Sequence, residues 1–221
     1  SARLLREVEA GIKECFKKYP TIESLSIDTW GVDYALLDGN DELIAPVYCY
    51  RDSRTNESIP EVHKIIPFEE LYAKTGIQYN VFNSVYQLYC DKVSGRMDKA
   101  ESLLMLPNYF MYKLTGVKAQ EYTNATTSGM INAGTREWDK EIIERLGYKS
   151  SLFTSLTAPA TELGEFTSEV AAFVGYKAKV TLPATHDTAS AVVAAPIEKG
   201  APYISSGTWS LLGVEEELAH T

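Results

Sequence analysis

The sequence predicts an α/β domain in which helices flank a mixed sheet. Apolar residues recur at helical spacing in residues 3–18, and short apolar runs bounded by turn residues occur at 34–37 and 178–182. Helical and strand-like segments then alternate along the chain. At 221 residues the chain is one large domain or two small ones, long enough to bury a hydrophobic core.

The N-terminal part is predicted to begin with a helix and to continue as an antiparallel meander. The helix covers residues 3–18, a short strand covers 25–30, and a second strand covers 34–37. The segment 38–41 (DGND) is typical of a hairpin turn. We therefore expect residues 43–48 to return as a strand.

Further helices are predicted where apolar residues recur at helical spacing between Gly and Pro residues. They cover 56–66, 67–71 with an end at Gly76, 83–93, 107–114 with an end near Gly116, 138–146 and 168–174. Residues 121–127, rich in Asn and Thr, are predicted to form an exposed loop. Residues 203–213 are expected to form two strands joined by a tight Ser-Gly-Thr turn.

The composition excludes several classes of partner. The net charge of −9 argues against nucleic acid or an anionic membrane. The three cysteines contain no CxxC pair, which favours reduced thiols in a cytoplasmic protein. There is no apolar run of about 18 residues, and we expect no signal peptide. The oligomeric state stays open.

An acidic residue at a predicted strand-to-helix junction is the first candidate for chemistry. Pro183 ends the apolar run 178–182, and Asp187 opens a helix of small residues. The Asp187 carboxylate would stand over a cleft at the positive end of this helix. The alternative is that Asp187 or Thr185 only caps the helix. His186 could orient a ligand hydroxyl or be a hydrogen-bonded core histidine.

Three other segments could contact a ligand. In residues 205–208 (SSGT), backbone amides and hydroxyls could hold a nucleotide phosphate; the alternative is a hairpin turn without a ligand. Gly31, in the segment 28–33 (DTWGVD), could let a polar ligand approach the backbone or could mark a bulge. Residues 79–83 (YNVFN) could line a sugar site or simply pack at a helix start.

A charged cluster follows the predicted meander. Arg51 and Arg54 flank Asp52. The two guanidinium groups could grip an anion, or the cluster could form a structural ion pair.

Together, these motifs resemble the FGGY family of carbohydrate kinases. The resemblance covers about residues 22–214 and rests on segments in a fixed order: 28–33 (DTWGVD), 50–55 (YRDSRT), 75–78 (TGIQ), 121–127 (EYTNATT), 186–191 (HDTASA) and 205–210 (SSGTWS). The first two segments are similar to those of the members that act on L-rhamnulose. The HDTASA segment is a looser, family-wide signal.

The resemblance implies an actin-like, ribonuclease-H-like ATPase domain. The implied reaction moves the γ-phosphoryl group of ATP, with Mg²⁺, to the 1-hydroxyl of L-rhamnulose, a small-molecule ketose. Asp187 matches the family's catalytic base, which accepts the proton of the sugar hydroxyl. The matching substrate contacts are Gly31, His186 and Thr188, and the matching ATP contacts are Gly207 and Thr208. No residue is assigned to a metal.

Family members are much longer than this chain. We therefore expect residues 1–221 to be the N-terminal, substrate-side domain, without the first strand hairpin and its phosphate loop and without the C-terminal ATP-binding domain. Little or no kinase activity is expected from the chain alone. Two alternatives remain: a family kinase for fuculose, xylulose or ribulose, and a non-catalytic sugar-binding domain of the same fold.

Overall fold

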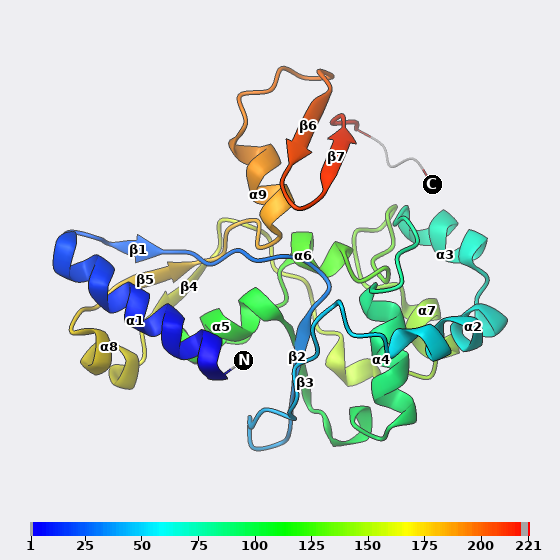
Figure 1. Ribbon diagram of the computed structural model, residues 1–221, viewed down its shortest axis with the longest axis horizontal. Coiled ribbons are helices and arrows are strands. Elements are labelled where there is room, and N and C mark those ends of the chain that lie inside the picture. The colour runs from blue at the N-terminus through cyan, green and yellow to red at the C-terminus, as the bar shows by residue number, and fades with distance from the viewer. Residues whose placement is uncertain (1, 218–220) are drawn as a thin grey trace.

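The computed structural model describes residues 2–217 and 221, in which helices and strands alternate (Figure 1). The predicted α/β class is confirmed. The helices are α1 (Ala2–Lys18), α2 (Thr55–Ile65), α3 (Phe68–Thr75), α4 (Ser84–Val93), α5 (Leu106–Thr115), α6 (Tyr122–Thr126), α7 (Lys140–Arg145), α8 (Ser168–Val174) and α9 (Asp187–Ala194), with 3₁₀ turns η1 (Met97–Lys99) and η2 (Ser150–Leu152). The strands are β1 (Ser24–Leu25), β2 (Tyr34–Leu37), β3 (Ser102–Met105), β4 (Glu162–Glu165), β5 (Lys179–Thr181), β6 (Tyr203–Ser206) and β7 (Ser210–Gly213).

One side of the molecule is built on a three-stranded mixed sheet of order β1-β5-β4. β1 runs parallel to β5, and β4 runs antiparallel to it. The apolar stripe of α1 and the inner face of α8 cover the sheet, so that Phe16, Val170 and Val180 are buried in one cluster. The strand predicted at 178–182 is thus confirmed as β5, buried at Val180 and Leu182.

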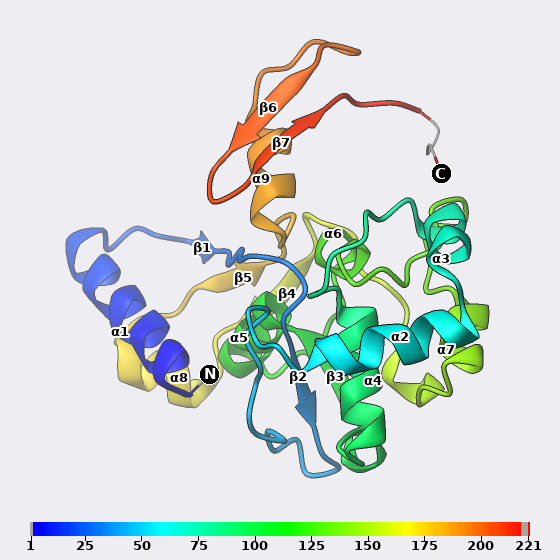
Figure 2. The same cartoon turned by 45° about the vertical axis from the view of Figure 1, so that its right-hand side comes forward.

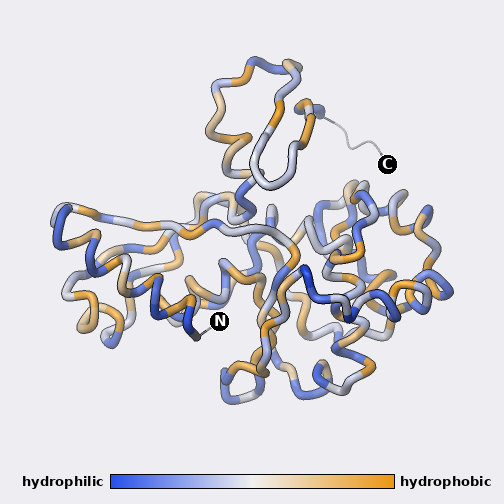
Figure 3. Tube along the Cα trace, in the orientation of Figure 1, coloured by the Kyte–Doolittle hydropathy of each residue, from blue (hydrophilic) through white to orange (hydrophobic). Residues whose placement is uncertain are grey.

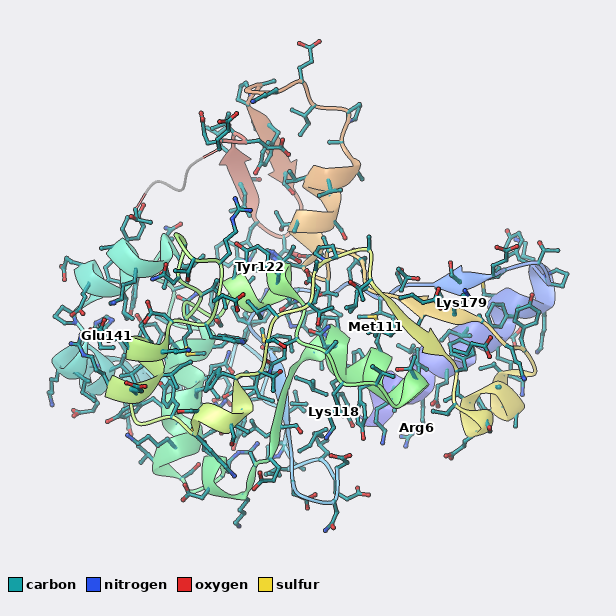
Figure 4. All side chains as sticks on the ribbon, turned by 180° about the vertical axis from the view of Figure 1, so that it is seen from behind. Arg6, Met111, Lys118, Tyr122, Glu141 and Lys179 are labelled. Carbon is teal, nitrogen blue, oxygen red and sulfur yellow. The ribbon has the colours of Figure 1, made fainter. Side chains whose placement is uncertain are left out.

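The other side is a helical region around the antiparallel pair β2–β3. Its larger core includes Val85 and Leu88 of α4. α5 joins the two sides because Met111 belongs to the sheet-side core, whereas Phe110 belongs to a core beneath β2 and β3. Viewed from behind, Met111 lies on the helix between the two halves (Figure 4). A helix that is apolar on several faces can serve as such a partition.

Local signals placed several helix ends correctly. Gly76 and Gly116 end α3 and α5 in the left-handed region, with φ of 65° and 75°. Both positions were predicted, because glycine adopts this backbone geometry without a Cβ penalty. Pro107 lies in the first turn of α5, where its missing N–H costs nothing.

The predicted returning strand at 43–48 is wrong. Only Leu43 forms a bridge to Leu37, and β2 pairs instead with β3 over its whole length. Beyond the bridge, the carbonyl oxygens of Ile44, Ala45 and Pro46 accept hydrogen bonds from the Arg96 guanidinium at 2.7–3.0 Å. These carbonyl oxygens face Arg96 rather than a neighbouring strand, and Pro46 has no N–H to donate to a ladder.

The predicted exposed loop at 121–127 is also wrong. Residues Tyr122–Thr126 form α6, and Glu121 and Asn124 are fully buried. The Glu121 carboxylate accepts the N–H groups of Thr123 and Asn124, so it caps this short helix. The polar side chains that suggested solvent exposure bond to buried backbone groups instead.

α9, β6 and β7 form an outer lobe (187–213) that projects from the rest of the molecule in both views (Figures 1 and 2). The predicted helix and two strands are present here. β6 and β7 pair only with each other among the described strands, and α9 has no buried residue. Hydrophobic stretches nevertheless run along the lobe (Figure 3), and Val193 and Leu212 are 77% and 76% exposed.

Candidate functional site

The junction before α9 is held at the main chain. The Thr29 N–H donates to the Thr185 carbonyl at 3.0 Å, and the Asp187 N–H donates to the Thr29 carbonyl at 2.9 Å. These bonds extend the β1–β5 side of the sheet by a parallel bridge between Thr29 and His186. The sequence folds this way because Pro183 cannot continue the ladder, after which small residues start a helix.

Asp187 is the first residue of α9, and its side chain is 58% exposed. Its Oδ1 accepts the N–H of Thr188 at 2.8 Å. His186 occupies the N-cap position without a side-chain cap, and the Thr185 hydroxyl donates to Glu121 instead. Thr185 therefore does not cap α9, and most of the Asp187 carboxylate faces solvent.

A cleft of about 720 Å³ lies beside Asp187, a volume typical of small-molecule sites. All of the residues predicted to contact substrate or nucleotide line it: Gly31, His186, Asp187, Thr188, Gly207 and Thr208. They come from the segment after β1, from the start of α9 and from the turn between β6 and β7. The cleft thus lies between the outer lobe and the body, and the ribbon in Figure 2 shows how the lobe stands away from the body.

Gly31 lies where two backbone segments approach closely. A Cβ at this position would come within 2.7 Å of the Thr127 side chain. The Thr127 hydroxyl also accepts the Val32 N–H at 2.9 Å. Val32 has a φ of 67°, a region that β-branched residues rarely adopt, and its carbonyl accepts from the Ser84 hydroxyl at 2.7 Å. This segment is therefore fixed in a strained shape at the cleft wall.

His186 is uncharged near neutral pH. Burial lowers the pKa of its imidazole below the usual value, although the carboxylates of Asp187 and Glu121 act in the opposite direction. Nε2 lies 3.5 Å from Asp187 Oδ1, so the two side chains are neighbours without forming an ion pair. A neutral imidazole on the cleft wall can donate one hydrogen bond to a sugar hydroxyl or accept one from it.

The turn predicted to bind phosphate is exposed, but its central amide is occupied. Gly207 N–H donates to the Trp209 carbonyl at 2.8 Å, and the Ser206 hydroxyl lies 3.1 Å from that of Ser210. A Cβ at Gly207 would meet no atom within 4 Å. Thr208 lines the cleft at this turn, and its nucleotide contact stays a prediction.

The cleft also contains aromatic and polar side chains: some come from segment 79–83, which was considered as a sugar-site wall, and the others had no ligand contact assigned from the sequence. Aromatic walls come from Trp30, Tyr50, Phe82 and Trp209, and polar groups from Gln78, Asn80, Asn83 and Thr127. Phe82 contacts the rings of Tyr50 and Trp209 at centroid distances of 5.4 and 6.1 Å. The segments 28–33, 75–78 and 79–83 pointed to this region, but only the tertiary structure brings them together.

Not every residue of the motifs faces the cleft. Tyr79 packs against His63, Phe68 and Tyr86, with centroid distances of 5.6–5.9 Å. Arg54 forms a structural ion pair with Asp91, at 2.7 Å, rather than an anion grip. Asn80, Phe82 and Asn83 thus line the cleft, and Arg54 supports the fold. A sugar contact by residues 79–83 and an anion grip by Arg51 stay predictions.

Within residues 2–217 and 221, no three His, Cys, Asp or Glu side chains gather as a metal site. In the same residues, no helix has the length and apolar character to cross a membrane.

The matches with known proteins agree with this fold. The N-terminal domain of the FGGY family of carbohydrate kinases matches residues 2–194, and the chain belongs to this family. It is 47% identical over 217 residues to the rhamnulokinase of Halalkalibacterium halodurans and 46% identical over 218 residues to that of Oceanobacillus iheyensis. These alignments cover 97% and 98% of this chain but 46% of each relative, so the chain spans less than half of their length.

Solved structures share the fold. A xylulose kinase from Rhodospirillum rubrum superposes with a TM-score of 0.82 at 18% identity, over 92% of this chain and 43% of that one. A carbohydrate kinase from Novosphingobium aromaticivorans gives 0.80 at 20% identity, over 96% and 46%. The predicted fold, the actin-like ATPase fold of the sugar kinases, is thus confirmed.

Proposed function

We propose that this chain binds the sugar in an ATP-dependent kinase that phosphorylates L-rhamnulose at its 1-hydroxyl. One observation carries the proposal: the exposed Asp187 carboxylate faces the same cleft as Gly31 and the turn at Gly207. The substrate is taken from the relatives named rhamnulokinase, which are 39–47% identical to this chain.

Asp187 would act as the general base. A sugar hydroxyl is a weak nucleophile, and a carboxylate within hydrogen-bond reach accepts its proton as the phosphoryl group moves. The neutral His186 and the Thr188 hydroxyl would orient the sugar, and Gly31 would let it approach the backbone. Most of the rate acceleration would come from this positioning.

The nucleotide would approach from the outer lobe. Thr208 offers a hydroxyl there, and the open space around Gly207 is compatible with a phosphate group. Mg²⁺ would neutralise charge on the phosphates. Among the residues that the structure describes, Asp187 is the only carboxylate that lines the cleft, and one carboxylate does not make a metal cage. We expect the ion to arrive with the nucleotide.

Sugar binding tests the substrate. We expect calorimetry on the chain to detect L-rhamnulose and to give weaker or no heat with L-fuculose, D-xylulose and D-ribulose. Trp30 and Trp209 line the cleft, so their fluorescence supplies a second readout. Preferential binding of another ketose would replace L-rhamnulose in the proposal, and binding of none would contradict it.

Asp187→Asn tests the base. Loss of the general base should lower phosphoryl transfer by about 10²-fold or more, because base catalysis typically contributes 10²–10⁴-fold. Sugar affinity should stay nearly unchanged, because the amide has the same shape. ADP release would be measured in the chain and in a longer kinase that contains it. Asp98→Asn, at an exposed position outside the cleft, is the matched control. Turnover that survives in Asp187→Asn would contradict the assignment.

A further inference from the structure

Glu121 is a fully buried carboxylate that lies outside the cleft and has no part in the proposed proton transfer. Its Oε2 accepts four hydrogen bonds, from the N–H and hydroxyl of Thr185 at 3.1 and 2.7 Å, the Thr123 hydroxyl at 2.7 Å and the Asn124 N–H at 3.1 Å. Oε1 accepts the Thr123 N–H at 2.8 Å. Hydrogen bonds to a carboxylate are stronger than neutral ones.

Capping of α6 does not by itself account for a glutamate here. Ser, Thr, Asp and Asn are the preferred N-cap residues, and an aspartate would cap this helix with a shorter side chain. The additional methylene of Glu121 lets Oε2 reach Thr185, which lies 64 residues further along the chain. The longer side chain therefore connects α6 to the junction before α9.

The connection continues to Asp187. The Thr185 carbonyl accepts the Thr29 N–H and, at 3.2 Å, the Asn124 amide. The His186 N–H donates to the Thr123 hydroxyl at 3.3 Å, and the Asp187 N–H donates to the Thr29 carbonyl. The main chain at residues 185–187 is thus linked to Glu121: Thr185 directly, His186 through Thr123, and Asp187 through Thr29 and Thr185.

Packing offers Asp187 no comparable support. α9 has no buried residue, and it stands in the outer lobe away from the described cores. Viewed from behind, Tyr122, the first residue of α6, lies at the base of this lobe (Figure 4). The orientation of the carboxylate must then come from the base of the lobe.

We infer that Glu121 is a positioning residue: through Thr185 it fixes the main chain at His186 and Asp187 and so aims the Asp187 carboxylate into the cleft. The consequence for phosphoryl transfer rests on the proposed function of Asp187. The positioning itself is a property of the chain without ligands.

Substitutions at Thr185 weaken the link while leaving the cap of α6 in place, because the hydroxyl bond to Glu121 can be removed while the Thr185 N–H bond remains. Thr185→Val removes the hydroxyl at nearly constant volume, whereas Thr185→Ser keeps it. In Thr185→Val we expect amide hydrogen exchange at Thr29 and Asp187 to accelerate about tenfold, as the loss of one buried hydrogen bond implies. This acceleration is measured relative to any change in the exchange of core amides. Thr185→Ser should exchange like the wild type. Thr115→Val, which removes a hydroxyl bonded within α5, is the control.

Glu121→Asp gives a second test that does not depend on the folding of the valine variant. The shorter carboxylate should still protect the Thr123 and Asn124 amides of α6, but exchange at Asp187 should accelerate by about tenfold. Wild-type protection of Asp187 in both Thr185→Val and Glu121→Asp would overturn the inference, as would equal loss of protection in α6 and at Asp187.

In a longer kinase that contains the chain, Thr185→Val should lower kcat and change KM little. The reason is that the substitution displaces the general base and leaves the sugar contacts in place. Hydrogen exchange requires neither sugar nor ATP. If no ketose is phosphorylated, the proposed function fails while the positioning inference is still decided by exchange.

Discussion

Asp33 is a buried carboxylate, 2% exposed, at the end of the DTWGVD segment. Burial raises its pKa to about 6, although the hydrogen bond from the Trp30 indole, the nearby Tyr50 backbone and the charge of Arg54 act in the opposite direction. Its Oδ2 accepts the Trp30 N–H at 2.8 Å, whereas Oδ1 has no partner. Asp33 therefore orients one aromatic wall of the cleft at a cost in stability.

The raised pKa determines how this destabilisation depends on pH. The folded state prefers the protonated acid, so the destabilisation is absent below the unfolded value of 3.8, grows as the pH rises towards about 6, and is complete above that. The total is about 3 kcal/mol, at about 1.4 kcal/mol for each unit of pKa. We expect Asp33→Asn to gain stability relative to the wild type by about 1.4 kcal/mol between pH 5 and pH 8.

Urea unfolding at the two pH values measures this difference. Asp28→Asn, an exposed position in the same segment, is the control for the loss of one negative charge. A stability difference between Asp33→Asn and the wild type that does not change with pH would contradict the buried ionised carboxylate.

At the scale of elements, α4 holds the segment that follows β2. The fully buried Asp91 accepts hydrogen bonds from Arg54 at 2.7 Å, from Arg96 at 2.9 Å and from the Tyr34 hydroxyl at 2.6 Å. Both guanidinium groups also lie near the ring of Tyr48, 3.7 Å (Arg54) and 5.1 Å (Arg96) from its centroid. Through Arg54 and Arg96, the Asp91 carboxylate thus fixes the segment after β2 that places Tyr50 at the cleft.

Asp91→Asn should lower the free energy of unfolding by about 3–5 kcal/mol, because two partly buried guanidinium groups lose their counter-charge. Glu162→Gln, in an exposed pair with Lys179, is the matched control and should cost about 1 kcal/mol or less. Chemical denaturation measures both. A cost for Asp91→Asn no larger than that of Glu162→Gln would show that the cluster adds no stability.

At the scale of the whole molecule, the two sides and the outer lobe differ in how they are stabilised. The sides share α5 as a common buried helix, whereas the lobe contributes mostly exposed side chains such as Ile204 and Leu212. Local stability follows buried contacts, so the lobe should open without the rest of the molecule unfolding.

We expect amides of residues 188–194 and 203–213 to exchange about 10²-fold faster than those of β3 and α5, as independent local opening implies. Hydrogen-exchange mass spectrometry on the chain measures this. Equal protection of the lobe and α5 would mean that the lobe opens only with global unfolding. L-rhamnulose should slow exchange at the junction before α9 if it binds in the cleft.

Sequence reasoning placed helices and turns well where the signals are local. α1, α3, α5 and α8 follow from apolar spacing and from glycine or proline at their ends, which act within one or two helical turns. The errors at 43–48 and 121–127 have one cause. Arg96 and Thr185 satisfy polar groups of segments that lie 50 or more residues away, and no local pattern reveals such partners.

By itself, the sequence determined the α/β class, the family and the set of residues around Asp187, because each depends on residue types in a fixed order. Only the tertiary structure decided that these residues share one cleft, that Tyr50, Gln78 and Thr127 join them, and that Glu121 lies beneath the junction. Those facts depend on which distant segments meet, which is decided by the burial of apolar faces and by the pairing of buried polar groups over the whole chain.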